Sequence, residues 1–295
     1  MGEVIEPSLA DDAIRVAATA LAEDGAIDIT SEVTVAGDAF ATAALEARSD
    51  GVLAGEAYAD AVVRACGLPG IAWALAPGDV FAAGATLGTL HGPMRAVLRA
   101  ERPLLNLLQR ACGIATATRA YVTAMHGTGC RVLHTRKTVP GLRGFDVRAV
   151  LAGGGTSHRL DLSRAVMVKD NHWRELESSG RSLEQARADA LERGVTAFQV
   201  EVESESQVRA ACAAGATRIL VDNQTPDTLR TWAELARGLS PDIEVEATGG
   251  VDLQSARAYA EAGADFISVG ALTHSVRALD ISLELSAVEK SGGPA

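Results

Sequence analysis

Cysteine is scarce in this chain, and the few cysteines lie far apart in the sequence. Cys66, Cys112, Cys130 and Cys212 form no C-x-x-C pair, which is the spacing typical of zinc sites and redox motifs. The sequence therefore argues against a zinc site and against a redox-active pair. It favours a reducing compartment, and we expect a cytoplasmic protein.

Long apolar runs and an excess of positive charge are missing as well. No stretch is long and apolar enough to span a bilayer, and the acidic first residues lack the apolar run of a signal peptide. The formal net charge is −11, whereas a nucleic-acid surface needs clustered Lys and Arg to neutralise phosphates. We therefore expect small-molecule substrates, with no membrane and no nucleic acid as partner.

Aromatic residues make up only 4% of the chain, but apolar residues make up 47%, enough for a substantial core. The length of 295 residues suggests one large or two moderate domains. Residues 39–92 show short alternating runs broken by Gly and Pro, which predicts strands, with a helix over residues 58–66 between them. This first part is predicted to be an α+β domain.

The last two-thirds of the chain follow a different pattern. Pro103 is predicted to lie in the first turn of a helix that Gly113 breaks, and a second helix follows over residues 115–125. After Gly127, strand-like runs alternate with helical stretches at intervals of roughly 20–35 residues, the size of βα units. This alternation predicts an α/β barrel with fewer than eight strands. The predicted boundaries are 1–112 for the first domain, 113–275 for the barrel, and 276–295 for a C-terminal helix that returns to the first domain and a disordered tail.

The six predicted strands of the barrel end on charged residues or glycine turns. They run into Arg136 and Lys137, Lys169 to His172, Glu201, Asp222, Glu246 to Gly250, and Gly270. Parallel strands closed into a barrel bring their C-terminal ends to one face, where catalytic residues lie. Between residues 131 and 169 the sequence holds eight Lys or Arg and only two acids. A basic pocket in an acidic protein predicts a small anionic substrate that carries phosphates.

Each of the cationic segments also has a simpler interpretation. Arg136 can grip a carboxylate in bidentate fashion and Lys137 can bind a phosphate, or both can lie in a solvated turn. The glycine triplet 153–155 lets backbone amides approach a ligand ahead of His158 and Arg159, or it is a flexible hinge. Lys169 can act as a Schiff-base nucleophile or as an anion ligand.

The acidic residues and the last glycine turns leave alternatives too. Glu201 and Asp222 can hold Mg²⁺ or ribose hydroxyls, or they pair with nearby lysines. The turns after the last two strands, at Thr248–Gly250 and Gly270, lie where such barrels bind phosphate through backbone N–H groups. A purely structural turn is the other interpretation.

Taken together, ordered segments over nearly the whole chain resemble the quinolinate phosphoribosyltransferase family, a type II phosphoribosyltransferase family also called nicotinate-nucleotide pyrophosphorylase (carboxylating). No single segment would be specific. The segments are ERPLLNLL and CGIAT within 101–116, HTRKTVPGLR at 134–143, GGGTSHR at 153–159, VMVKDNH at 166–172, VEVES at 200–204, LVDN at 220–223, ATGGV at 247–251 and SVGALTHS at 268–275.

The resemblance implies an activity and an assembly. The family transfers the phosphoribosyl group of PRPP to the ring nitrogen of quinolinate and releases diphosphate and CO₂, which gives nicotinate mononucleotide in the de novo synthesis of NAD. Its members need Mg²⁺ and are at least homodimers. The implied fold is an N-terminal α+β sandwich domain followed by an incomplete α/β barrel, with the sandwich of one subunit covering the barrel of its partner.

The resemblance also implies residue roles. The quinolinate ligands would be Arg136, His158, Arg159 and Lys169, with Arg102 supplied to the neighbouring subunit's site. The catalytic residues would be Lys137, Lys169, Glu201 and Asp222, of which Glu201 and Asp222 would also bind Mg²⁺. The phosphate ligands would be Lys137, Thr248, Gly249, Gly250, Gly270 and His274.

Some positions depart from the family pattern. Val147 replaces a usual lysine, Ser157 a common asparagine, Gln199 the first glutamate of an EVEV pattern, and Thr248 a common serine. None of these changes removes a residue with an implied chemical role. They leave room for a paralogous phosphoribosyltransferase acting on a related aromatic acid. A Schiff-base aldolase using Lys169 and a non-catalytic anion-binding protein are the more distant alternatives.

Overall fold

The structure is a computed structural model that describes residues 8–290, and the chain divides into two compact units. The first unit comprises the chain up to Arg119, residues 139–154 and the chain from Ser275 onward; the second comprises residues 120–138 and 155–274. The disordered tail expected at 291–295 lies outside the described residues. Within residues 8–290, no helix has both the length and the apolar character needed to cross a bilayer.

The first unit is built on an antiparallel sheet. Its four strands in the described chain have the order β12-β1-β5-β3, and a separate two-stranded pair joins β2 and β4. Side chains of β1 alternate between buried and half-buried, because successive residues of a strand point to opposite faces. The bounds are β1 Ala39–Ala47, β2 Gly51–Val52, β3 Ala72–Trp73, β4 Val80–Phe81, β5 Thr86–Pro93 and β12 Ile281–Lys290.

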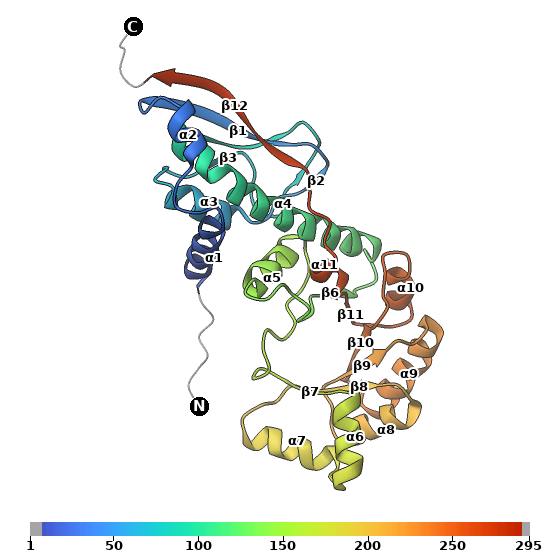
Figure 1. The fold of residues 1–295 in the computed structure, drawn as a ribbon. Helices are drawn as coiled ribbons and strands as arrows, with labels where there is room; N and C mark the ends of the chain where they lie inside the picture. Colours follow the sequence, from blue (N-terminus) through green and yellow to red (C-terminus); the bar gives the residue numbers. More distant parts are fainter. Residues whose placement is uncertain (1–7, 291–295) are drawn as a thin grey trace. The chain divides into compact units, whose positions relative to one another are not determined.

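Helices complete the first unit. They are α1 Leu9–Glu23, α2 Ile29–Thr34, α3 Glu56–Ala65, α4 Met94–Ala124, whose last residues belong to the second unit, and α5 Arg143–Ala152. Helix α4 passes along one face of the antiparallel sheet (Figure 1). The buried carboxylate of Asp12 on α1 joins three helices, since it accepts hydrogen bonds from Tyr58 Oη at 2.7 Å and Arg148 Nη1 at 3.0 Å.

Two local predictions for this unit are wrong. Helix α4 continues through Pro103 and Gly113 instead of starting at the first and breaking at the second. A Cβ at Gly113 would overlap the carbonyl oxygen of Arg277, so this glycine serves a close approach of two segments and does not end the helix.

The predicted C-terminal helix is instead strand β12, which pairs antiparallel with β1 along its length. Ile281, Leu283 and Leu285 alternate with polar residues, and that period of two favours a strand. Residues 139–154, predicted to lie in the barrel, also belong to the first unit. There the fully buried carboxylate of Asp146 accepts two hydrogen bonds from Arg110 of α4, at 3.0 and 2.9 Å.

The second unit confirms the predicted incomplete barrel. Within the described residues its sheet has six parallel strands, in the order β6-β11-β10-β9-β8-β7. The strands are β6 Arg131–Leu133, β7 Val166–Val168, β8 Phe198–Val202, β9 Arg218–Asp222, β10 Glu244–Thr248 and β11 Phe266–Ser268. The helices are α6 Asp170–Ser179, α7 Leu183–Glu192, α8 Glu205–Ala213, α9 Pro226–Leu239, α10 Ala256–Glu261 and α11 Ala271–His274.

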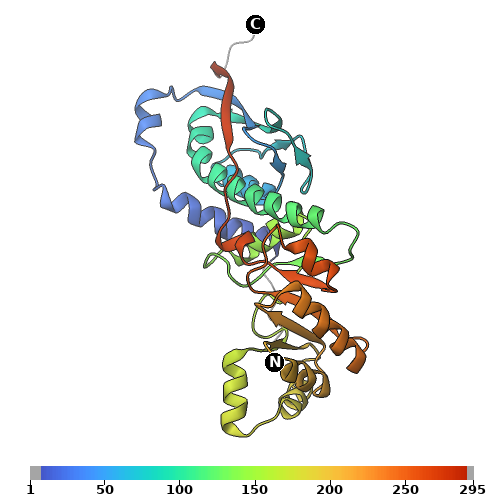
Figure 2. The same cartoon turned by 90° about the vertical axis from the view of Figure 1, so that its right-hand side faces the viewer.

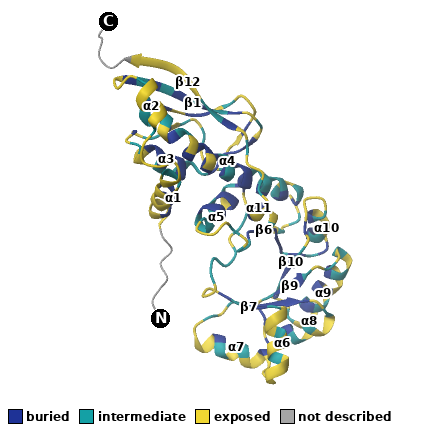
Figure 3. Ribbon diagram, viewed as in Figure 1, coloured by how far each residue is buried: buried dark blue, intermediate teal, exposed yellow. Residues whose placement is uncertain are grey.

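The strands of the parallel sheet form the core of this unit. All five residues of β8 are buried, and Figure 3 shows β8 to β10 mostly dark, whereas α6 is mostly exposed. Helices α8 to α10 lie along the outer face of the sheet (Figure 2). Because all six strands run in the same direction, their C-terminal ends meet at one edge of the sheet.

Candidate active site

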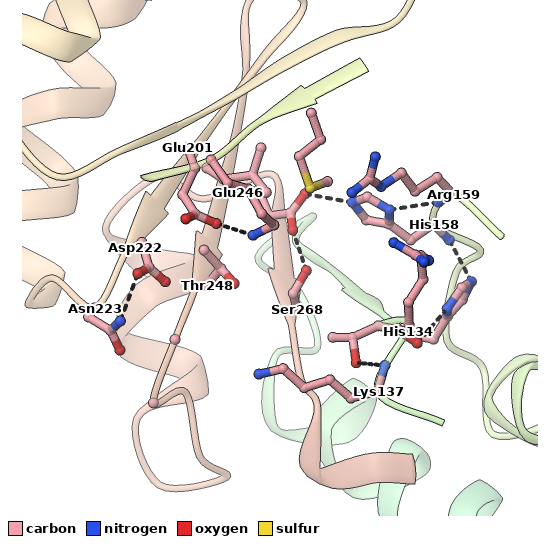
Figure 4. A pocket seen from close by; sticks show the side chains of 17 residues that line it. His134, Lys137, His158, Arg159, Glu201, Asp222, Asn223, Glu246, Thr248 and Ser268 are labelled. Carbon is pink, nitrogen blue, oxygen red and sulfur yellow. Dashed lines mark hydrogen bonds and ion pairs between the residues drawn. The ribbon is translucent and has the colours of Figure 1, made fainter. Parts of the chain in front are cut away.

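A cavity of about 600 Å³ opens at the C-terminal ends of the parallel strands. Such a volume falls within the usual range of ligand pockets. Figure 4 shows the acidic Glu201 and Asp222 on one side of this cavity and His134, His158 and Arg159 on the other. The lining residues are His134 to Lys137, His158, Arg159, Met167, Lys169, Glu201, Leu220, Asp222, Asn223, Glu246, Thr248 to Gly250, and Ser268.

The strand period places these side chains. On β9, Leu220 and Asp222 line the cavity, and on β10, Glu246 and Thr248 line it, because alternate residues of a strand share a face. The residues between them face the packed side of the sheet.

The cationic side of the cavity holds the guanidinium groups of Arg136 and Arg159, and within residues 8–290 neither forms an ion pair with an acid. Arg136 Nε is buried and has no hydrogen-bond partner among the described residues. Arg159 donates from Nη1 to the carbonyl oxygen of Ala165 at 3.2 Å. Burial first, and then the charge of Arg136, lower the pKa of Arg159, although Glu246 partly opposes this. Two repelling cations with a donor left open predict a site for an anion.

The acidic side combines an ion pair with a less well stabilised carboxyl group. Lys169 Nζ donates to Glu201 Oε2, and Trp173 Nε1 donates to the Glu201 carbonyl oxygen at 2.8 Å. Burial raises the pKa of Asp222, while the Asn223 amide, which donates to Asp222 Oδ2 at 2.7 Å, and the charge of Lys169 lower it in part. Asp222 therefore gains from any cation brought to it.

A tight turn closes the acidic side. Gly249 and Gly250 both have positive φ, 75° and 63°, and Asn223 adopts φ 51°, a region that asparagine tolerates better than most residues. A Cβ at Gly249 would lie 2.7 Å from Asp222 Oδ1 and would overlap the Asn223 amide oxygen. Only glycine lets this turn pack directly on the Asp222–Asn223 pair.

The cavity is also lined by a buried carboxylate that the sequence analysis did not assign to the site. Glu246 is 1% exposed and accepts hydrogen bonds from Ser268 Oγ and from Arg218 Nη1, the latter at 2.9 Å. Burial works against its charge, but the bond from His158 and these two partners outweigh burial and lower its pKa. Glu246 is thus a fully compensated buried anion.

Most predicted site residues gather in this one cavity. The ten that line it are Arg136, Lys137, His158, Arg159, Lys169, Glu201, Asp222, Thr248, Gly249 and Gly250. Gly270 and His274 lie next to it, since a Cβ at Gly270 would be 3.0 Å from Lys137 Cδ and 3.1 Å from the His274 ring. Arg102 is exposed on α4 in the first unit and does not line this cavity.

The polar run after Lys169 lies outside the cavity. Asp170, Asn171 and His172 form the exposed first turn of α6 and do not line the cavity. His172 Nδ1 instead accepts the backbone N–H of Lys169 at 2.9 Å and caps the helix. Of this run, only Lys169 belongs to the site.

Sequence reasoning missed several lining residues. They are His134, Thr135, Met167, Leu220, Asn223, Glu246 and Ser268. The signal for Glu246 was available, because it stands two residues before Thr248 on the same strand and must share its face. The conformation of Asn223 left no comparable signal.

The donors available to a metal ion are few. The described residues contain no group of three or more His, Cys, Asp or Glu side chains placed to hold one. Glu201 and Asp222 both line the cavity, but one Glu201 oxygen is already paired with Lys169. Mg²⁺ is commonly bound through one or two carboxylates, several waters and substrate phosphates. The pair therefore fits a Mg²⁺ ion that arrives with a phosphorylated substrate.

Comparison with known families gives a consistent result over the chain. Residues 28–112 match the model described as Quinolinate phosphoribosyl transferase, N-terminal domain, and residues 114–284 match the corresponding C-terminal domain. The nicotinate-nucleotide pyrophosphorylase [carboxylating] of Mycobacterium leprae is 38% identical over 262 residues, which is 88% of this chain and 91% of that protein. The human protein of the same name is 38% identical over 264 residues, 88% of this chain and 87% of its own.

Solved structures show the same similarity. The nicotinate-nucleotide pyrophosphorylase from Francisella tularensis superposes with a TM-score of 0.85 at 31% identity and covers 97% of this chain and 100% of its own. NadC from Streptococcus pyogenes gives a TM-score of 0.85 at 32% identity and covers 99% and 100%.

Proposed function

The chain belongs to the quinolinate phosphoribosyl transferase family, and we propose that it transfers the phosphoribosyl group of PRPP to quinolinate in NAD biosynthesis. The products are nicotinate mononucleotide, diphosphate and CO₂. The observation that carries this proposal is that the guanidinium groups of Arg136 and Arg159 line one cavity, where Arg136 Nε has no hydrogen-bond partner among the described residues. A pyridine dicarboxylate supplies the two negative charges that such a pair lacks.

The opposite side of the cavity suits PRPP. We assign the ribose hydroxyls to Glu201 and Asp222, and the 5-phosphate to the backbone N–H groups of the turn at Thr248–Gly250, with Gly270 and His274 next to it. Lys137 lies in the same cavity, and we assign it to the diphosphate. As diphosphate departs, positive charge develops on the ribose, where the two carboxylates stabilise it.

Holding the two substrates side by side is expected to accelerate the reaction as well. The cationic side of the cavity positions the ring nitrogen of the diacid, and the acidic side positions the ribose. The attack of the ring nitrogen on the ribose thereby becomes effectively intramolecular. After transfer, loss of the 2-carboxylate leaves a carbanion next to a cationic ring nitrogen. That nitrogen stabilises the carbanion until the carbon takes up a proton from solvent, so the reaction needs no organic cofactor. We assign Lys169, held by Glu201, to the departing carboxylate.

We propose Mg²⁺ as the cofactor. When bound it neutralises the diphosphate leaving group. Asp222 is the side chain we assign to it first, because burial disfavours its charge and no lysine among the described residues forms an ion pair with it, whereas Glu201 is engaged by Lys169. Glu201 is the second candidate ligand.

The assembly and location are further proposals. We propose a homodimer in which Arg102 completes the neighbouring subunit's site; its exposure on α4 is compatible with that role. We propose a cytoplasmic location, supported by four free cysteines among the described residues. The family membership removes the reason to consider a Schiff-base aldolase or a non-catalytic anion-binding protein.

The direct test is to incubate the protein with PRPP, Mg²⁺ and a panel of pyridine carboxylates, and to measure diphosphate and CO₂ release. We expect both products only when quinolinate and PRPP are present together. Nicotinate, which lacks the second carboxylate, should react poorly because one guanidinium stays unpaired. Diphosphate release with another aromatic acid and none with quinolinate would instead identify a paralogous enzyme.

A further inference from the structure

Lys137 lies on a segment that belongs to no helix or strand. Strand β6 ends at Leu133, and the next helix, α5, begins at Arg143. Lys137 is exposed, and its flexible four-carbon stem lets the ammonium group take many positions. Figure 4 shows this side chain extending from the side of His134 toward the side of Thr248. A lysine assigned to the diphosphate must therefore be directed by contacts with other residues.

Two threonine hydroxyl groups hold the backbone of Lys137. Its N–H donates to Thr135 Oγ1 at 3.1 Å, and its carbonyl oxygen accepts a hydrogen bond from Thr273 Oγ1 at 2.8 Å. The first bond is local, because Thr135 is two residues away. Thr273 lies 136 residues further along the chain, in helix α11, which follows β11, the neighbour of β6 in the sheet. The second bond therefore ties the segment to the rest of the barrel.

The surroundings of Thr273 make this bond a firm one. Thr273 is 1% exposed, so water does not compete for its hydroxyl group, and a buried hydroxyl group needs a partner. Oγ1 also lies 3.3 Å from the carbonyl oxygen of Gly270. A hydroxyl group has one hydrogen to donate, and the shorter distance makes Lys137 the main acceptor.

The side chain of Lys137 is guided by the same turn. A Cβ at Gly270 would lie 3.0 Å from Lys137 Cδ and 3.1 Å from the ring of His274. The stem of Lys137 therefore passes directly over Gly270, where a larger residue would push it away. Residues 270–274 thus hold Lys137 at its backbone and along its stem.

We propose that Thr273 is a positioning residue, which holds the backbone of Lys137 so that its ammonium group contacts the diphosphate of PRPP. This inference rests on the proposed function. The departing diphosphate gains negative charge, and a cation stabilises that charge best when it is in place before the reaction. Because the turn of Thr273 also lies next to the proposed 5-phosphate site, the bond fixes the spacing between the two ends of bound PRPP.

Two substitutions of Thr273 test the hydroxyl group. Thr273→Val keeps the size and branching of the side chain but removes the donor, whereas Thr273→Ser keeps the donor. In Thr273→Val we expect kcat/KM for PRPP to fall about 3- to 10-fold, in line with the loss of one hydrogen bond. In Thr273→Ser it should stay within about twofold of the wild-type value. Equal losses in the two variants would overturn the proposal.

Thr118→Val is the matched control. Thr118 is completely buried on α4, and its Oγ1 donates to the carbonyl oxygen of Ile114, also at 2.8 Å. It does not line the cavity. We expect this variant to lose as much thermal stability as Thr273→Val but to keep its kcat/KM for PRPP. A kinetic loss as large as that of Thr273→Val would mean that general destabilisation causes the effect.

A double-mutant cycle shows whether Thr273 acts through Lys137. The probe is inorganic diphosphate with Mg²⁺, and titration calorimetry measures its affinity. We expect Thr273→Val and Lys137→Ala each to weaken binding, and the double variant to bind as weakly as Lys137→Ala alone. Losses that multiply in the double variant would mean that Thr273 acts independently of Lys137, and the proposal would then be wrong.

A carbonyl signal of the free protein tests the anchor without any enzymatic activity. The chain has three lysines, and only Lys137 is followed by threonine. Labelling with carbonyl-¹³C lysine and ¹⁵N threonine therefore gives one correlated NMR signal, from the Lys137 carbonyl carbon and the Thr138 nitrogen.

Loss of the hydrogen bond to the carbonyl oxygen should move this ¹³C signal upfield in Thr273→Val. Thr273→Ser and Thr118→Val should leave it in place. An unmoved signal in Thr273→Val would refute the anchor. If the wild-type protein releases no diphosphate, the proposed function fails, and the carbonyl signal still decides whether the anchor exists.

Discussion

Removing Arg136 should damage activity while sparing the fold. Two charge-assisted hydrogen bonds to a carboxylate contribute about 1.5–3 kcal/mol each. Arg136→Ala should therefore cost about 3–6 kcal/mol of transition-state stabilisation, which is about 10²- to 10⁴-fold in kcat/KM for quinolinate. Arg136→Lys keeps the charge but loses the planar fork, so its loss should be smaller. Initial rates of diphosphate release at saturating PRPP and Mg²⁺ measure both.

The same substitution should leave the free protein at least as stable as the wild type. The mutation removes a buried Nε that has no partner among the described residues, and an unmet buried donor costs about 1–3 kcal/mol. It also removes the positive charge of Arg136, which is the second cause, next to burial, of the lowered pKa of Arg159. A base whose pKa falls on folding destabilises the folded protein at every pH below that pKa, so this relief applies at neutral pH. Lost packing of the Arg136 stem opposes these gains.

Arg110→Ala is the matched control for this prediction. Arg110 binds the buried carboxylate of Asp146 through two hydrogen bonds in the first unit, and it does not line the cavity. Removing it leaves a buried charge unpaired, a loss of about 3–5 kcal/mol. We expect a lower thermal unfolding midpoint with the quinolinate KM of the remaining folded protein unchanged. If Arg136→Ala lowers the midpoint as Arg110→Ala does and leaves kcat/KM for quinolinate intact, the reasoning about Arg136 is wrong.

Three further predictions concern the neighbouring subunit, the metal and the glycine turn. Arg102→Ala and Lys169→Ala should each be inactive alone, but mixed dimers should recover activity in one of their two sites; verified mixed dimers without activity would exclude a shared site. Asp222→Asn should raise the Mg²⁺ concentration needed for half-maximal rate. Because folding raises the pKa of Asp222, its charge destabilises the fold at neutral pH, so the variant should also unfold at a higher temperature, a gain that vanishes below the ordinary aspartate pKa of 3.8. Gly249→Ala forces a Cβ against Asn223 at positive φ and should raise the KM for PRPP more than that for quinolinate; equal effects in steady-state kinetics would contradict the placement of the 5-phosphate.

The barrel was predictable because its signals are local. The six parallel strands contain short apolar stretches that lead to a polar or glycine residue, and all six lie at or just before the strand-end residues named from the sequence. The residues at the strand ends fall in one cavity because parallel strands share a direction. Neither step needs knowledge of distant contacts.

The errors arose where a distant segment decides the outcome. Gly113 appeared to end a helix, but it accommodates the backbone at Arg277, more than 160 residues away. The C-terminal segment has the local period of two of a strand, but its partner strand β1 lies far away in the sequence. Residues 139–154 join the first unit through Asp146 and its partner on α4. Local propensity cannot report contacts of this kind.

Two kinds of charged side chain line the site. Some are left to bind the substrate, and others are satisfied within the protein. Arg136 has an open donor, and folding disfavours the charged forms of Arg159 and Asp222, so these side chains gain most from a ligand. Glu246 lines the same cavity, yet folding favours its charge. Burial cannot explain the difference, because Glu246 is almost completely buried. What differs is the neighbours: Arg218, Ser268 and the imidazole satisfy this carboxylate within the protein, and they leave the cations around it to be satisfied by the substrate.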